Sequence, residues 1–166
     1  MLNTTIGIVG VGGVGGYVAE FICRIGCKKI ILFDGDVFVH TNLNRQLFSN
    51  SENISKNKAI EAKRQLELIN PNQKIEAYDC FVENNSFCLE ILSKCDLIFS
   101  CAVPYETDPA SIKNLFFNLI FLHHIPVIDG GITKDGKACA SIITEDNLDY
   151  FNYIFNGYII NTNKNI

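Results

Sequence analysis

A cluster of glycines near the N-terminus has the composition of a phosphate-binding turn. It follows an apolar run at residues 6–9 and comprises Gly10, Gly12, Gly13, Gly15 and Gly16. Gly10 can take the positive φ of a sharp turn off a strand, and Gly12 and Gly13 let a phosphate approach the backbone because they carry no side chain. Gly15 would let the following helix, expected at 15–25, lie close to the strand. The N–H groups at the start of that helix would attract an anion, so the cluster predicts a phosphorylated ligand.

An acidic residue stands where such a ligand would place a sugar. Asp34 ends the next apolar run, at 29–33, and follows Gly15 by 34 − 15 = 19 residues. A carboxylate at the tip of a second strand can accept hydrogen bonds from ribose hydroxyls. The order strand, glycine turn, helix, strand and acid predicts the first half of a nucleotide-binding α/β fold. An NAD-dependent oxidoreductase shares these features and stays open as one alternative.

The remaining chain alternates between short apolar runs and helical patterns. Strands are expected at 75–78, 97–101, 126–128 and 138–143, and helices at 56–69, 86–92 and 108–122. This alternation predicts an α/β fold with a Rossmann-like, mostly parallel sheet and helices on both faces. In the first helix, Val18, Phe21, Ile22 and Ile25 recur at the spacing of a buried face. Residues 1–148 are expected to form one ATP-binding adenylation domain, for the reasons that follow, and 149–166 an aromatic and then Asn/Lys-rich tail.

The residues after Asp34 match a more specific pattern than the glycine turn does. The matching residues are Gly10-Val-Gly12-Gly13-Val-Gly15, Asp34-Gly-Asp36, Thr41-Asn42-Leu-Asn-Arg45-Gln46, Lys58 at a helix start, and Asp108. In this order they resemble the motifs of the ThiF/MoeB/HesA family, which includes the ubiquitin-activating enzymes. The resemblance extends from about Ile6 to Ile143. An oxidoreductase would leave Arg45, Lys58 and the Asn-Leu-Asn-Arg-Gln run without a purpose.

The resemblance implies a Mg²⁺- and ATP-dependent adenylyltransferase. Such an enzyme activates the C-terminal carboxylate of a ubiquitin-like or sulfur-carrier protein, typically ending in Gly-Gly, as an acyl-adenylate. By motif match, the nucleotide turn would be formed by the glycines Gly10, Gly12, Gly13 and Gly15. Asp34 and Asp36 would belong to the nucleotide site, with Asp34 on the ribose, and Asn42 would bind a phosphate or fix its loop. Arg45 and Lys58 would bind the phosphates, and Asp108 would bind Mg²⁺. Glu106 competes with Asp108 as the Mg²⁺ ligand. Relatives are commonly dimers, which implies a homodimer or a partner subunit.

The sequence departs from the family after about Ile143. The family usually continues with paired Cys-x-x-Cys zinc ligands, a crossover loop and sometimes a catalytic cysteine, whereas no cysteine follows Cys139 here. A first alternative is therefore a non-catalytic or truncated relative that acts as a nucleotide- or partner-binding module. A relative that activates a small-molecule or tRNA-linked carboxylate also falls within the adenylating class.

Composition excludes several other classes of protein. The 166 residues carry a net charge of −4 and no basic tract, which argues against a nucleic acid as the main partner. No apolar stretch reaches the roughly 18 residues that a membrane span needs, and no signal peptide is evident. The seven cysteines are irregularly spaced, as expected for reduced thiols in a cytoplasmic protein, and Cys101 and Cys139 are expected in the core.

Overall fold

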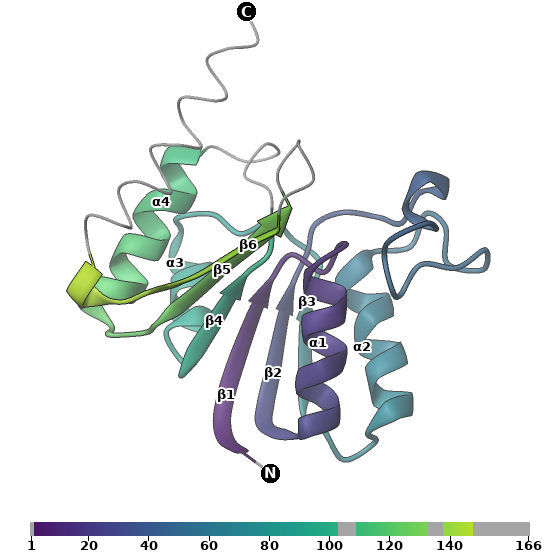
Figure 1. Ribbon diagram of the computed structural model, residues 1–166, viewed down its shortest axis with the longest axis horizontal. Helices are drawn as coiled ribbons and strands as arrows, with labels where there is room; N and C mark the ends of the chain where they lie inside the picture. The colour runs from purple at the N-terminus through teal and green to yellow at the C-terminus, as the bar shows by residue number, and fades with distance from the viewer. Residues whose placement is uncertain (1, 103–108, 133–137, 148–166) are drawn as a thin grey trace, which may run out of the picture.

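The computed structural model describes residues 2–102, 109–132 and 138–147. Within these ranges the chain forms six strands and four α-helices, joined by loops and by short 3-10 and π-helical turns (Figure 1). In chain order the elements are β1 (Leu2–Val9), α1 (Gly15–Ile25), β2 (Cys27–Phe33), the 3-10 turn His40–Asn42, α2 (Lys58–Ile69), β3 (Ile75–Tyr78), α3 (Ser86–Leu92), β4 (Leu97–Ser100), α4 (Pro109–Phe117), the π-helical turn Asn118–Leu122, β5 (Val127–Ile132), β6 (Ala138–Ile143) and the 3-10 turn Glu145–Asn147. None of these helices is long and apolar enough to cross a membrane.

The element boundaries agree closely with those expected from sequence. The bounds of α1, β3, α3 and β6 are the predicted ones. β1, β2, α2 and β4 each differ from the predicted bounds by a few residues at one end, and two segments near the C-terminus differ more. The helix expected at 108–122 changes to π-helical geometry after Phe117, and β5 runs on to Ile132 because it pairs with β6 along its whole length.

All six strands lie in one sheet, in the order β3-β2-β1-β4-β5-β6. β1 to β5 pair in parallel and β6 pairs antiparallel with β5, which confirms the mostly parallel sheet. The strand order reverses between β1 and β4, and open α/β sheets bind ligands at the carboxyl ends of two such strands. Val9 at the end of β1 pairs with Ser100 at the end of β4. The glycine turn therefore begins at this reversal point (Figure 1).

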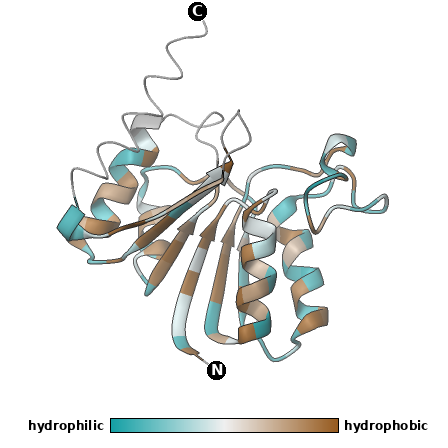
Figure 2. Ribbon diagram, viewed as in Figure 1, coloured by the Kyte–Doolittle hydropathy of each residue, from teal (hydrophilic) through white to brown (hydrophobic). Residues whose placement is uncertain are grey.

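Helices cover the sheet on both faces, as expected. Successive residues of a strand point to opposite faces. In β2, Ile30 and Leu32 pack with buried residues of α1 and α2, whereas Ile31 and Phe33 pack with those of α3 and α4. The inner parts of β1 and β2 are accordingly apolar, whereas the N-terminal ends of both strands carry polar residues (Figure 2). This burial on both sides fixes the carboxyl ends of β1, β2 and β4 relative to one another.

α1 packs on the sheet through small residues rather than through the predicted apolar stripe. Its buried residues are Gly15, Gly16, Ala19, Ile22 and Cys23. Phe21 is 65% exposed and Ile25 46% exposed, so the expectation that both lie in the core is wrong. The glycines and Ala19 let the helix approach β1 closely, and this orientation turns positions 21 and 25 to the outside.

All seven cysteines are free thiols. Cys139 is exposed, contrary to expectation, and it lies on β6, the strand at the edge of the sheet. Cys101 is only half-buried, so its predicted place in the core is also wrong. It follows β4 directly and lines the cavity described next.

Candidate active site

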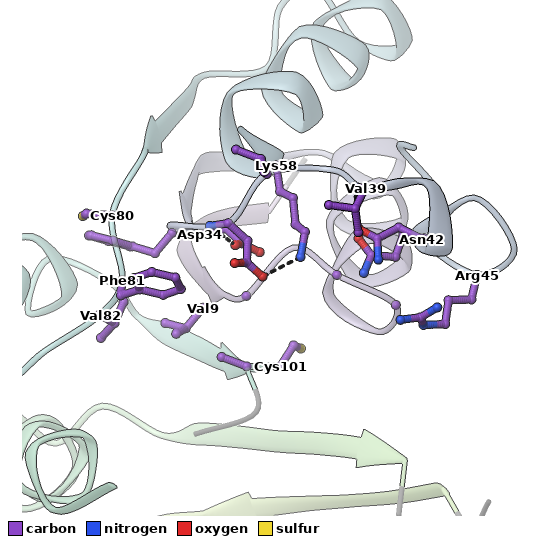
Figure 3. Close-up of a pocket in the computed structure, with 18 of the residues that line it drawn as sticks. Val9, Asp34, Val39, Asn42, Arg45, Lys58, Cys80, Phe81, Val82 and Cys101 are labelled. Carbon is purple, nitrogen blue, oxygen red and sulfur yellow. Dashed lines mark hydrogen bonds and ion pairs between the residues drawn. The ribbon is translucent and has the colours of Figure 1, made fainter. Parts of the chain in front are cut away.

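A cavity of about 540 Å³ opens at the carboxyl ends of the central strands (Figure 3). It is lined by the glycine turn, the loop after β2, the start of α2, the segment after β3 and the end of β4. Eight residues with a predicted site role lie along it: Gly10, Gly12, Gly13, Asp34, Asp36, Asn42, Arg45 and Lys58. The structure therefore brings together residues that are up to 48 positions apart in the chain (58 − 10 = 48).

A side chain would clash with the backbone at the start of the glycine turn, whereas there is room for one further along it. Gly10 has a φ of +86°, and a Cβ there would lie 2.7 Å from the backbone nitrogen of Ala102. A Cβ on Gly12 or Gly13, by contrast, would have no neighbour closer than 3.6 Å. The N–H groups of Gly12 and Gly13 donate to no protein group in the described part of the chain. They are free to donate to an anion in the cavity.

Asp34 holds this turn in place. Its Oδ2 accepts a hydrogen bond from the Val11 N–H at 2.7 Å, and its Oδ1 accepts one from the Asp36 N–H at 2.9 Å. Burial raises the pKa of the Asp34 carboxyl above its ordinary value, and it outweighs the lowering by these two bonds and by Lys58. Asp34 thus joins the β2 loop to the glycine turn, a contact that its predicted role on the ribose did not include.

If Asp34 contacts a ribose, as the motif match implies, its raised pKa predicts that the affinity for a nucleotide falls in acid. A proton on the carboxyl occupies a lone pair that a ribose hydroxyl would use, so affinity should fall as pH drops through the raised pKa. That loss should begin at a higher pH than it would for a carboxyl with the ordinary aspartate pKa of 3.8. Asp34→Asn should bind more weakly and lack this titration. Isothermal titration calorimetry with ATP from pH 7 downward would test it, and parallel pH curves for the two proteins would contradict it.

Lys58 enters the cavity from the first turn of α2, where it is paired with an acid. Its Nζ lies 2.7 Å from Asp36 Oδ2, and the residue is only 7% exposed (Figure 3). The preceding Asn57 caps α2 by accepting from the Ile60 N–H, and its Nδ2 donates to the carbonyl oxygens of Asp34 and Asp36. The Asn57 side chain thus positions both the start of α2 and the loop that carries Asp34 and Asp36, called the acidic loop below. Sequence reasoning assigned no role to Asn57.

Arg45 lies across the glycine turn from the apolar end of the cavity (Figure 3). It is exposed, and its Nη1 donates to the Thr41 carbonyl at 2.6 Å and to Asn44 Oδ1 at 3.0 Å. Asn42 is buried and fixes the same loop, because its Oδ1 accepts from the Val39 N–H. The loop thereby holds a cation at the rim of the cavity, next to the Gly13 backbone.

The opposite end of the cavity is apolar and was not found from sequence. Cys80, Phe81 and Val82 line it directly after β3. A Cβ on Gly35 would lie 2.7 Å from the Phe81 backbone nitrogen and from its ring, so only a glycine lets this segment close over the β2 loop. The Gly35 in the Asp-Gly-Asp motif is the one sequence signal that could have indicated this close approach.

Among the predicted site residues that the structure describes, Gly15 does not line the cavity. Gly15 lies behind the turn, where a Cβ would meet the Gly10 carbonyl oxygen at 1.8 Å, so it serves the close packing of helix and turn. Asp108 and its competitor Glu106 lie outside the described residues, and so does the 149–166 tail. Within the described residues, no three His, Cys, Asp or Glu side chains are grouped so as to hold a metal ion.

Curated relatives share sequence with most of this chain. It is 29% identical over 136 residues to the adenylyltransferase and sulfurtransferase UBA4 of Candida albicans, which aligns 81% of this chain with 30% of that protein. It is 37% identical over 117 residues to ubiquitin-like modifier-activating enzyme 5 of Drosophila willistoni, which aligns 64% of this chain with 29% of that protein. The chain therefore spans less than a third of the length of these relatives.

Solved structures with the same architecture include two from E. coli. MccB with MccA-N7isoASN superposes with a TM-score of 0.73 and 25% identity, covering 86% of this chain and 40% of MccB. The tRNA N6-threonylcarbamoyladenosine dehydratase TcdA in complex with AMP gives a TM-score of 0.68 and 26% identity, covering 78% of this chain and 51% of TcdA. Residues 1–152 match the ThiF family, and with the glycine-turn cavity on a mostly parallel sheet this match shows that the chain belongs to that family.

Proposed function

We propose that this chain is a Mg²⁺- and ATP-dependent adenylyltransferase that activates the C-terminal carboxylate of a ubiquitin-like or sulfur-carrier protein ending in Gly-Gly. The observation that carries the proposal is the shared cavity: the free N–H groups of the glycine turn, the Asp34 carboxylate and the Lys58 ammonium all face it. The printed names of UBA4 and of modifier-activating enzyme 5 support the reaction class, and AMP in the TcdA structure supports the nucleotide.

Different parts of the cavity suit the base, the ribose and the phosphates of ATP. Its volume of about 540 Å³ falls within the range of small-molecule sites, roughly 300–1,000 Å³. The base would lie at the apolar end beside Phe81 and Val82, and the ribose beside Asp34. The phosphates would then lie over Gly12 and Gly13, between Lys58 and Arg45.

In the proposed reaction a carboxylate oxygen of the carrier bonds to the α-phosphorus while the bond to the α–β bridging oxygen breaks. Pyrophosphate leaves with that electron pair, and the acyl-adenylate remains. Negative charge grows on the phosphate oxygens, so cations fixed in advance stabilise the transition state. Lys58 uses one of its three ammonium donors on Asp36, and Arg45 uses only Nη1 within its loop. Both side chains keep donors for a phosphate.

Asp108 is the proposed protein ligand for Mg²⁺, with Glu106 as the alternative. Magnesium bound to the triphosphate would neutralise part of its charge, and a carboxylate oxygen suits this hard cation. A homodimer or a partner subunit, and a cytoplasmic location, complete the proposal. The seven free thiols support a reducing compartment.

A non-catalytic nucleotide-binding module is the second candidate. The observation that favours it is that Arg45 and Lys58 already contact protein groups, Thr41 and Asn44 for the arginine and Asp36 for the lysine. In such a module these contacts would persist when nucleotide binds. The two candidates therefore differ in turnover rather than in nucleotide affinity.

ATP:pyrophosphate exchange separates the two candidates. With Mg²⁺ and a carrier protein ending in Gly-Gly, we expect carrier-dependent exchange that Arg45→Ala and Asp108→Ala each reduce by about a hundredfold or more. Direct ATP binding is measured in parallel. Binding without exchange would favour the module, and binding of NAD in place of ATP would overturn the nucleotide assignment.

A further inference from the structure

Gln46 carries an unexplained polar atom at the edge of the cavity. The residue is 8% exposed, and its Oε1 is the one buried side-chain nitrogen or oxygen among the described residues that has no hydrogen-bond partner. A buried amide oxygen without a donor costs the fold free energy that a smaller or apolar side chain would avoid. The contacts within the free protein therefore do not account for a glutamine at this position.

Gln73 shows how this chain treats a buried glutamine whose role is structural. It is 5% exposed, and its amide is fully engaged. Oε1 accepts from the Cys27 N–H at 3.1 Å, and Nε2 donates to the carbonyls of Cys27 at 3.0 Å and Lys74 at 3.2 Å. The amide of Gln73 therefore joins two segments of the chain, whereas the amide oxygen of Gln46 has no partner.

Hydrogen bonds hold the backbone of Gln46, and its side-chain amide points toward the glycine turn. Its N–H donates to the Asn42 carbonyl at 2.9 Å, and its carbonyl accepts from the Ser49 N–H and hydroxyl. The amide faces the open part of the glycine turn, since a Cβ on Gly12 would lie 3.6 Å from Gln46 Nε2. The side chain therefore lines the cavity on the side where the N–H groups of Gly12 and Gly13 are free.

We propose that Gln46 is a nucleotide-contacting residue, whose Nε2 donates to a phosphate oxygen held over Gly12 and Gly13. The inference rests on the proposed function, because it presupposes that the cavity takes a nucleoside phosphate. It adds a neutral donor to the two cations, and it explains why a costly side chain is present there.

A stability and binding comparison tests this role. Gln46→Met keeps the length and volume of the side chain but removes both polar atoms. We expect its melting temperature to rise, because the unpaired oxygen is gone, while its Kd for ATP rises by about ten- to a hundredfold. Gln46→Glu places a negative charge beside the phosphate and should bind ATP more weakly still. Calorimetric ATP binding and thermal unfolding in the absence of nucleotide give both quantities.

Gln73→Met is the matched control. It should lower the melting temperature, because it breaks three hydrogen bonds, and leave ATP affinity within about twofold. If Gln46→Met binds ATP as tightly as the wild type, or if it melts lower than the wild type, the contact is wrong and the proposed function is untouched. If the wild type itself binds no ATP, the proposed function and this inference fall together.

Discussion

Replacing Lys58 with alanine is expected to reduce carrier-dependent ATP:pyrophosphate exchange by about a hundred- to a thousandfold. Lys58 is 7% exposed and lies in the first turn of α2, and its ammonium is held by Asp36, so it can meet developing phosphate charge with little reorganisation. Its removal does more than delete a cation. Asp36, whose Oδ2 lies 2.7 Å from Nζ, would then face the phosphates without its partner and repel them.

The double variant Lys58→Ala/Asp36→Asn separates these two effects. Removing the uncompensated carboxylate should recover part of the lost ATP affinity, measured by calorimetry, without restoring exchange. Lys56→Ala is the control, since Lys56 is exposed two positions away and should change exchange by less than about twofold. Equal ATP affinities in the single and double variants would show that Asp36 exerts no repulsion, and wild-type exchange in Lys58→Ala would remove Lys58 from the mechanism.

Much of the fold could be predicted because its signals are local. A strand segment buried on both faces, such as residues 30–33 of β2, must be apolar, and the glycine cluster marks the turn that leaves β1. Five parallel strands with intervening helices then admit few arrangements. The glycine turn and Asp34 are local signals of the same kind, whereas the roles predicted for Asn42 and Arg45 follow from the resemblance to the ThiF/MoeB/HesA motifs.

The contacts that tune the site depend on loop conformation and could not be predicted in this way. Asp36 was expected to belong to the nucleotide site, and the structure places it in the lining of the cavity. Its ion pair with Lys58, 22 positions along the chain, was not predicted. Asn57 joins the start of α2 to the acidic loop, and Gln46 is left unpaired, only because the loop from 37 to 57 folds back on itself. No spacing rule encodes such a fold-back.

Periodicity also fails where packing is set by small residues. The pattern of α1 predicts an apolar face that includes Phe21 and Ile25, yet the helix buries Gly15, Gly16 and Ala19 instead. Close approach to the sheet outweighs the burial of two large side chains, because the turn and the helix start share one crowded space. Cys139 shows the related error for a strand: apolar neighbours do not reveal that a strand lies at the sheet edge.

That crowded space underlies the largest expected effect on stability. Gly15→Ala would place a Cβ 1.8 Å from the Gly10 carbonyl oxygen and 3.2 Å from Cys101 Cβ. Neither the turn nor the helix can yield alone, because Gly10 itself is closed in by the Ala102 backbone and donates its N–H to the Phe33 carbonyl. We expect a loss of more than about 4 kcal/mol in the free energy of unfolding, measured by urea denaturation.

Gly16→Ala makes the opposite prediction one residue later. A Cβ there would lie 3.6 Å from the side chains of Leu47 and Phe48, which is ordinary contact. Alanine also favours helix over glycine by up to about 1 kcal/mol, so this variant should be as stable as the wild type or more so. The pair thus isolates steric closure at position 15 from the general effect of adding a methyl group to α1. A Gly15→Ala protein within about 1 kcal/mol of the wild type would show that the turn can open, and the rigid glycine turn proposed for phosphate binding would lose its structural basis.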